Sequence, residues 1–61
     1  MRKLKFEDLK VGEFYHDDCD LLRFIGMRNN ELAEFELVGD DEEVIDVEIS
    51  LTKMEVGMLK R

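Results

Sequence analysis

Residues 31–51 constrain the fold of this chain more than any other stretch, because apolar and polar residues alternate on both sides of an acidic turn. Alternation with a period of two is typical of a β-strand that buries one face. The apolar positions of the two predicted strands are Ala33, Phe35, Leu37, Ile45, Val47, Ile49 and Leu51. The stretch therefore predicts a hairpin with one face in the core and a second face rich in carboxylates.

The register of this hairpin follows from its loop, residues 39–43, if core residues must pair with core residues. The predicted pairs are Phe35 with Val47 and Leu37 with Ile45 on the inner face, and Glu36 with Asp46 and Glu34 with Glu48 on the outer face. Like charges directly opposite each other destabilise a sheet by up to ~1 kcal/mol a pair. We expect such a ladder of acids to exist for a functional reason, unless lysines or arginines from elsewhere in the chain intervene.

The segments before the hairpin predict a helical turn and two strands. Residues 5–9 suit a single helical turn, with Phe6 and Leu9 closing one end of the core. A first strand begins at residues 11–12 and extends to residue 16. Either Phe14 or Tyr15 points inward there, and the hydroxyl makes Tyr15 the one expected to be half-exposed.

A polar loop at residues 16–20 leads into a second strand at residues 20–27, which is apolar on both faces. Gly26 marks a place where this strand can bend or bulge. The pair Asn29 and Asn30 predicts a tight type I′ turn into the hairpin. After the hairpin, residues 52–54 suit a 3₁₀-type turn and residues 55–59 a brief closing strand.

The length of 61 residues predicts one domain, residues 1–61, that buries only roughly 60% of its unfolded surface. A chain this small has no room for a deep substrate cleft, so we expect no enzyme. There is no apolar run near the ~20 residues of a membrane span and no signal-peptide core at the N-terminus, which predicts a cytoplasmic protein. Cys19 is the single cysteine, which excludes an internal disulfide and fits a reducing compartment.

The net charge of −7 is distributed unevenly. Residues 13–48 hold thirteen acidic side chains against two arginines, whereas both ends of the chain are basic. Phosphate binding requires a contiguous basic surface, so the body of the protein is poorly suited to direct nucleic-acid binding. The two ends could form a small basic patch if they lie side by side.

Five short strands and one helical turn in a chain of this size predict an all-β, five-stranded small barrel, because an open sheet would leave two unprotected edges. The order of features resembles the SH3-like barrels, and most closely the Tudor-type branch, over about residues 11–54. The resemblance rests on Val11 and Gly12 at the first strand, on the acidic loop before residues 20–25, and on the spacing of Ala33, Phe35, Leu37, Val38, Gly39, Asp40, Glu42 and Val44.

The resemblance supports the fold and argues against the usual activity of Tudor domains, which enclose a methylated cation in an aromatic cage. Leu37 and Val38 stand where the family has an Asp-Tyr pair, so an anionic partner and one cage wall are missing. Tyr15 and Phe24 could each supply a ring, but two rings do not make a cage.

The remaining candidates for chemistry are weak. His16 and Cys19 have a metal-ligand spacing, but a structural zinc site needs four ligands, mostly Cys and His. The same pair lacks an orienting third group for catalysis. Residues 40–43 lack the central glycine and the ligand spacing of a calcium loop. We therefore expect no catalytic residue, no metal and no cofactor.

The sequence favours a non-catalytic, acidic protein-interaction module that binds a basic surface of a partner. One concrete version is a small phage-type or mobile-element inhibitor that mimics nucleic acid. The candidate binding residues are Glu34, Glu36, Asp40, Asp41, Glu42, Glu43, Asp46 and Glu48, and the candidate apolar interface is Leu21, Ile25 and Met27. The alternative is a nucleic-acid-associated small-barrel subunit that oligomerises in the Sm manner or touches RNA through its basic ends. The oligomeric state stays open, with a homodimer as one option.

Overall fold

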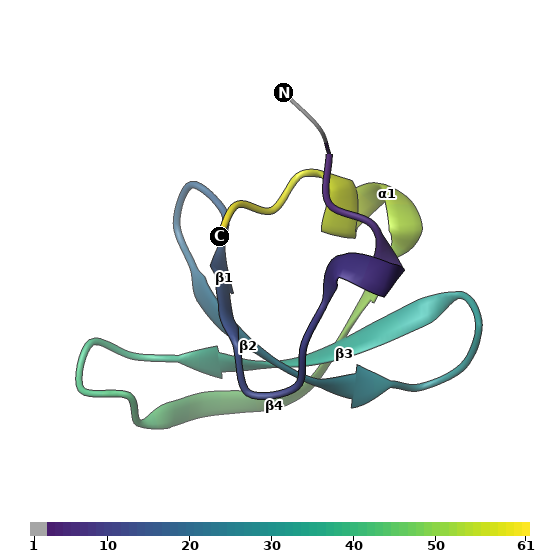
Figure 1. Cartoon of the computed structure of the whole chain (residues 1–61). Helices are drawn as coiled ribbons and strands as arrows, with labels where there is room; N and C mark the ends of the chain where they lie inside the picture. The colour runs from purple at the N-terminus through teal and green to yellow at the C-terminus, as the bar shows by residue number, and fades with distance from the viewer. Residues whose placement is uncertain (1–2) are drawn as a thin grey trace.

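The computed structural model describes residues 3–61, which form a four-stranded antiparallel sheet with a short helix and a 3₁₀ turn (Figure 1). The elements in chain order are η1 (Phe6–Asp8), β1 (Phe14–His16), β2 (Leu21–Met27), β3 (Leu32–Val38), β4 (Val44–Thr52) and α1 (Lys53–Gly57). The strands follow one another across the sheet in the order β1-β2-β3-β4. The predicted mostly-β class, the N-terminal helical turn and the first four strands are confirmed.

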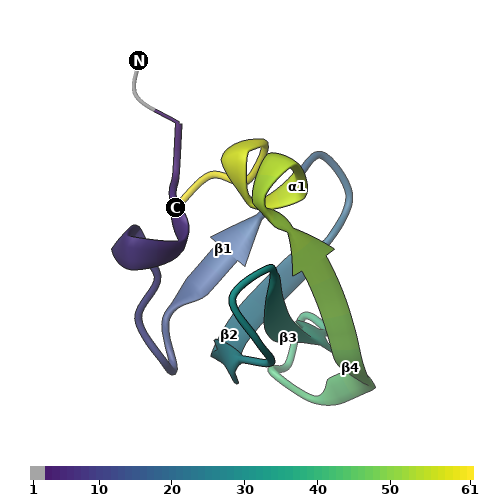
Figure 2. The same cartoon turned by 90° about the vertical axis from the view of Figure 1, so that its right-hand side faces the viewer.

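The core lies on the side of the sheet that η1, α1 and the C-terminal segment cover (Figures 1 and 2). Phe35 is at its centre, with an edge-on contact to Tyr15 at 6.2 Å and a tilted contact to Phe24 at 5.4 Å between ring centroids. The other buried members of the core are Leu9, Leu22, Ala33, Val56 and Leu59. Phe6 packs against this core, as the sequence predicted.

Tyr15 is only 2% exposed, so the expectation that it would be half-exposed is wrong. Its hydroxyl accepts a hydrogen bond from the Lys10 backbone N–H at 3.1 Å and donates one to the Asp8 carbonyl at 3.5 Å. A phenol can be buried when its hydroxyl is hydrogen-bonded. The N-terminal turn supplies those partners, and Phe14 is the half-buried neighbour on the other face.

The predicted irregularity at Gly26 is confirmed, because the β2–β3 register shifts between Phe24 and Gly26 and Gly26 has a φ of 144°. The predicted type I′ turn is wrong. Neither asparagine has a positive φ, and the connection spans residues 28–31. The Asn29 side chain instead accepts hydrogen bonds from the backbone N–H groups of Glu31 and Leu32. The loop is therefore organised by a side-chain cap rather than by left-handed backbone.

The predicted register of β3 and β4 is also wrong. Phe35 pairs with Ile49, Leu37 with Asp46 and Val38 with Val44, so two irregularities insert extra residues into β4. Glu48 lies at one of them with a φ of 62°. Ile45 and Val47, expected in the core, are 61% and 55% exposed. A bulge moves each later residue of its strand to the opposite face of the sheet. A register derived by pairing core residues with core residues across the loop cannot anticipate this change.

The predicted closing strand at residues 55–59 is wrong, because α1 occupies most of that segment. Thr52 and Glu55 form a capping box, in which each side chain accepts the backbone N–H of the other residue. Val56 fixes the helix to the core and is fully buried. The C-terminal segment makes one antiparallel bridge to β1, between His16 and Lys60, and the sheet is not closed into a five-stranded barrel.

Candidate functional site

The acidic turn lies at the end of the β3–β4 hairpin that points away from α1 (Figure 1). A hydrogen bond of 2.8 Å from the Gly39 N–H to the Glu43 carbonyl closes the turn, and Glu42 has a φ of 62°. The Glu43 carboxylate folds back to accept the Asp41 N–H at 3.1 Å. It also contacts the Gly39 Cα region so closely that any Cβ there would clash with it. Asp40, Asp41 and Glu42 are exposed to solvent.

Glu36 has a structural role that the sequence did not indicate. Its Oε1 accepts hydrogen bonds from Arg23 Nε at 2.9 Å and Nη2 at 2.7 Å, and Arg23 is the residue opposite it on β2. The Arg23 guanidinium also lies 5.9 Å from the centre of the Phe14 ring. Glu36 is thus paired within the sheet and contributes little free charge to a partner.

The predicted ladder of opposed acids does not form. Glu34 pairs with Ser50 on one side and with Gly26 on the other, and Glu36 lies across from Arg23. Asp46 and Glu48 remain exposed on the irregular half of β4, beside three exposed apolar side chains: Val44, Ile45 and Val47. The hairpin end therefore presents a mixed acidic and apolar surface. We call it the hairpin surface and define it as residues 40–42 and 44–48.

The predicted apolar interface of Leu21, Ile25 and Met27 is divided by the bulge. Leu21 is half-buried and pairs with Val38, whereas Met27 pairs with Ala33, which belongs to the core face. Ile25 is the extra residue of the bulge and is 40% exposed. Because cross-strand partners point to the same side of a sheet, the bulge places Leu21 and Met27 on opposite faces.

The loop between β1 and β2 is held by Asp17. Its Oδ1 accepts the backbone N–H groups of Cys19 at 2.8 Å and Asp20 at 2.7 Å. These two hydrogen bonds lower the pKa of Asp17 below its ordinary value of 3.8. His16 Nε2 lies 3.2 Å from the Arg61 carbonyl oxygen, and Cys19 is an exposed free thiol. His16 and Cys19 therefore contact the loop and the C-terminus rather than each other.

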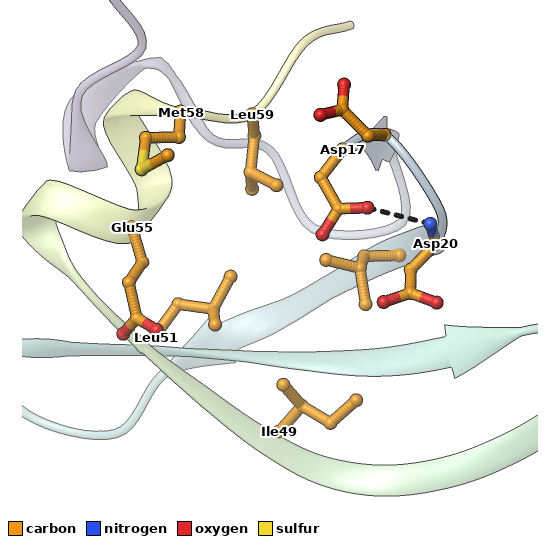
Figure 3. Close-up of a pocket in the computed structure, with 9 residues that line it drawn as sticks. Asp17, Asp20, Ile49, Leu51, Glu55, Met58 and Leu59 are labelled. Atoms are coloured by element: carbon orange, nitrogen blue, oxygen red, sulfur yellow. Dashed lines mark hydrogen bonds between the residues drawn. The ribbon is translucent and has the colours of Figure 1, made fainter.

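A groove of about 280 Å³ separates this loop from β4 and α1 (Figure 3). Its apolar lining consists of Leu22, Ile49, Leu51, Met58 and Leu59, and its acidic rim consists of Asp17, Asp18, Asp20 and Glu55. Sequence reasoning missed this groove because it assigned residues 55–59 to a strand. Recognising Thr52 and Glu55 as a capping box would have placed Glu55 at the start of a helix.

The two basic ends of the chain lie side by side, as the sequence allowed. Lys3 and Leu4 line a surface depression of about 560 Å³ together with Lys60, Arg61 and residues 57–59. The side chain of Lys3 also lies 3.7 Å from where a Cβ on Gly57 would be. Arg2, another basic residue of the N-terminal segment, lies outside the described residues.

Residues 3–61 contain no group of three or more His, Cys, Asp or Glu side chains arranged to hold a metal ion. Within the same range, no helix has the length and apolar character needed to cross a membrane. Comparison with family models, with curated proteins and with solved structures found no match to this chain.

Proposed function

We propose that this protein is a non-catalytic interaction module whose hairpin surface binds a basic surface of a partner protein. One observation carries the proposal. Of the eight acids predicted to bind a partner, Glu36 is the one with a cationic partner among residues 3–61, and Glu34 is half-buried beside Ser50. The other six are exposed near Val44, Ile45 and Val47, which are 43%, 61% and 55% exposed. Unpaired carboxylates and exposed apolar side chains thus occupy the same end of the hairpin.

The two kinds of side chain have complementary roles in binding. Unpaired surface carboxylates raise the association rate with a positively charged partner, and this effect weakens as salt screens the charges. Apolar side chains at the centre of an interface provide most of the affinity when they leave water. A surface that offers both is suited to a specific protein partner.

The proposal extends to the class of partner and to the fold. Basic surfaces of proteins are commonly nucleic-acid sites, so the module would act as a small inhibitor that occupies such a site in place of nucleic acid. The fold would be a variant of the SH3-like barrel, with the Lys60 bridge to β1 in place of a full closing strand. The strand order and the capping of the core by α1 support this assignment.

The test is affinity capture from extract of the native cell or its host, with and without added duplex DNA as competitor. We expect the captured protein to bind nucleic acid and to be displaced by DNA. The double variant Asp46→Lys, Glu48→Lys should weaken its binding at least tenfold, and Ile45→Ser should weaken it further through the dissociation rate.

The matched control is the double variant Glu7→Lys, Glu13→Lys, which makes the same change in net charge at exposed positions away from the hairpin. This control should retain binding. Equal weakening by both double variants would show that only the overall charge matters and would overturn the role of the hairpin surface.

A second candidate function is a nucleic-acid-associated subunit that touches RNA through its ends. The observation that favours it is the adjacency of Lys3, Lys60 and Arg61 around one depression. Binding of single-stranded RNA that falls steeply with salt and is lost in the variant Lys60→Gln, Arg61→Gln would support this function. A ring-sized mass in solution would support the Sm-like form of it.

A further inference from the structure

We propose that the groove between β4, α1 and the β1–β2 loop binds one arginine or lysine side chain of a partner peptide (Figure 3). The aliphatic stem would lie on the apolar lining, with the cationic head group at the acidic rim. This site is separate from the hairpin surface and does not depend on the function proposed for it.

The apolar lining is the edge of the core, where buried residues meet partly exposed ones. Leu22 and Leu59 are buried core residues, and Ile49 and Leu51 pack against the core while remaining partly exposed. The groove lies between the edge strand β4, α1 and the β1–β2 loop, where the sheet does not close on itself. Met58 adds a flexible thioether that is 70% exposed at the edge of the groove.

The groove has room for one long side chain. Its volume of about 280 Å³ is just below the roughly 300–1,000 Å³ of pockets that hold whole small molecules. Long cationic side chains commonly lay their methylene stems on apolar surface while the charged end stays in a polar setting. An apolar lining with a charged rim is the complement of that shape.

The acidic rim determines that the bound group carries a positive charge. All four polar residues of the groove are acids, and none of them has a Lys or Arg within ion-pair distance in residues 3–61. Asp17 uses Oδ1 to hold its loop, and Glu55 uses Oε1 to cap α1, so both carboxylates are held in position with a second oxygen left over. Figure 3 shows Asp17 and Asp20 on one side of the groove and Glu55 on the other.

The geometry favours arginine over lysine. Its guanidinium presents five donors in a plane and can donate to more than one carboxylate of the rim, whereas an ammonium acts as a compact point charge. An anionic ligand would meet four carboxylates. A bare metal ion would leave the apolar lining in contact with water.

The test uses a blocked pentapeptide, acetyl-Gly-Leu-Arg-Leu-Gly-amide, and the same peptide with citrulline in place of arginine. Backbone amide shifts of the labelled protein are followed during titration. We expect saturable shifts confined to the β1–β2 loop, the second half of β4 and α1. The citrulline peptide, which keeps the shape and loses the charge, should bind at least tenfold more weakly.

The variant Asp18→Asn, Asp20→Asn, Glu55→Gln removes three rim charges and keeps the loop and the helix cap, because Asp17 is untouched and glutamine also serves in a capping box. It should weaken arginine-peptide binding at least tenfold. The matched control, Asp40→Asn, Asp41→Asn, Asp46→Asn, makes the same charge change on the hairpin surface and should leave binding unchanged. Met58→Ser should weaken both peptides by a similar factor.

The proposal would be overturned by equal weakening in the two triple variants, by shifts that map to the hairpin, or by equal binding of the citrulline peptide. A concentration-dependent dimer abolished by the rim variant would assign the groove to a second copy of the chain instead. One triple variant changes only the groove rim and the other changes only the hairpin surface. A negative result at the groove therefore leaves the test of the hairpin surface intact.

Discussion

Tyr15 illustrates how a single residue joins local and long-range structure. Its ring packs edge-on against Phe35 in the core, and its hydroxyl lies between two backbone groups of the N-terminal turn. No residue within η1 itself is buried, so the Tyr15 hydroxyl, buried Leu9 and the half-buried ring of Phe6 together connect the N-terminal turn to the core.

Tyr15→Phe should therefore destabilise the protein by about 1 kcal/mol, because the Lys10 N–H and the Asp8 carbonyl lose a partner while the ring contacts remain. Urea unfolding measures the change. The rate of hydrogen exchange at the Lys10 amide should rise by more than the loss in global stability explains. Unchanged stability would mean that water replaces the hydroxyl at no cost.

The carboxylate of Asp17 should contribute stability that depends on pH. Its pKa is lower in the folded state than its ordinary value of 3.8, because two backbone N–H groups donate to the ionised form. This contribution is fully present above the unfolded pKa and is lost as pH falls through the lower folded pKa.

Asp17→Ala should thus be less stable than the unmodified chain near neutral pH, and the difference should shrink at a pH below the folded pKa. Urea unfolding at the two pH values tests this. Asp17→Asn is the control, because its side-chain oxygen still accepts both N–H groups and should retain most of the stability with little dependence on pH. A difference that stays constant with pH would contradict the assignment.

At the scale of elements, the bulges decide what each strand presents. Gly26 in β2 separates Leu21 from Met27, and the two irregularities in β4 turn Ile45 and Val47 out of the core. Bulges also protect an edge strand against pairing with another chain. β4 is an edge of the sheet, and its irregular half carries Asp46 and Glu48.

Gly26→Ala should destabilise the protein by about 1–3 kcal/mol, because a φ of 144° is strained for any L-residue with a Cβ. No atom lies within 4 Å of the position that the Cβ would take, so backbone strain is the only expected cause. D-alanine at this position, introduced by chemical synthesis, should restore stability.

Gly57→Ala is the matched control. Gly57 has no positive φ, and its nearest neighbour would lie at an ordinary 3.7 Å from an added Cβ. Alanine there should be neutral or slightly stabilising, because it restricts the unfolded chain. Equal loss of stability at both glycines would point to packing rather than to backbone conformation.

At the scale of the whole molecule, charge is segregated. Lys3, Lys60 and Arg61 surround one depression, while acids occupy the groove rim and the hairpin surface. Met58 and Leu59 line both the groove and the basic depression, so the two signs of charge meet at the C-terminal segment. Repulsion among the remaining acids opposes the compact state.

Stability should therefore rise with added sodium chloride at neutral pH, because screening relieves repulsion more than it weakens the Arg23–Glu36 pair. Thermal unfolding at increasing salt measures this. The control is the triple variant Asp40→Asn, Asp41→Asn, Asp46→Asn, whose melting temperature should be higher at low salt and less dependent on salt. A fall in stability with salt would show that ion pairing outweighs repulsion.

The mostly-β class, the N-terminal turn, the four strands and the bulge at Gly26 could be predicted from the sequence, because strand alternation and glycine chemistry are local properties. The sequence also indicated the acidic body and the basic ends. The burial of Tyr15, the pairing of Glu36, the register of β4 and the groove beside α1 could not be predicted in this way. Each of these depends on a contact between distant segments: the hydroxyl partners of Tyr15, the arginine across from Glu36, the extra residues in one strand only, and a helix that Val56 fixes to the core.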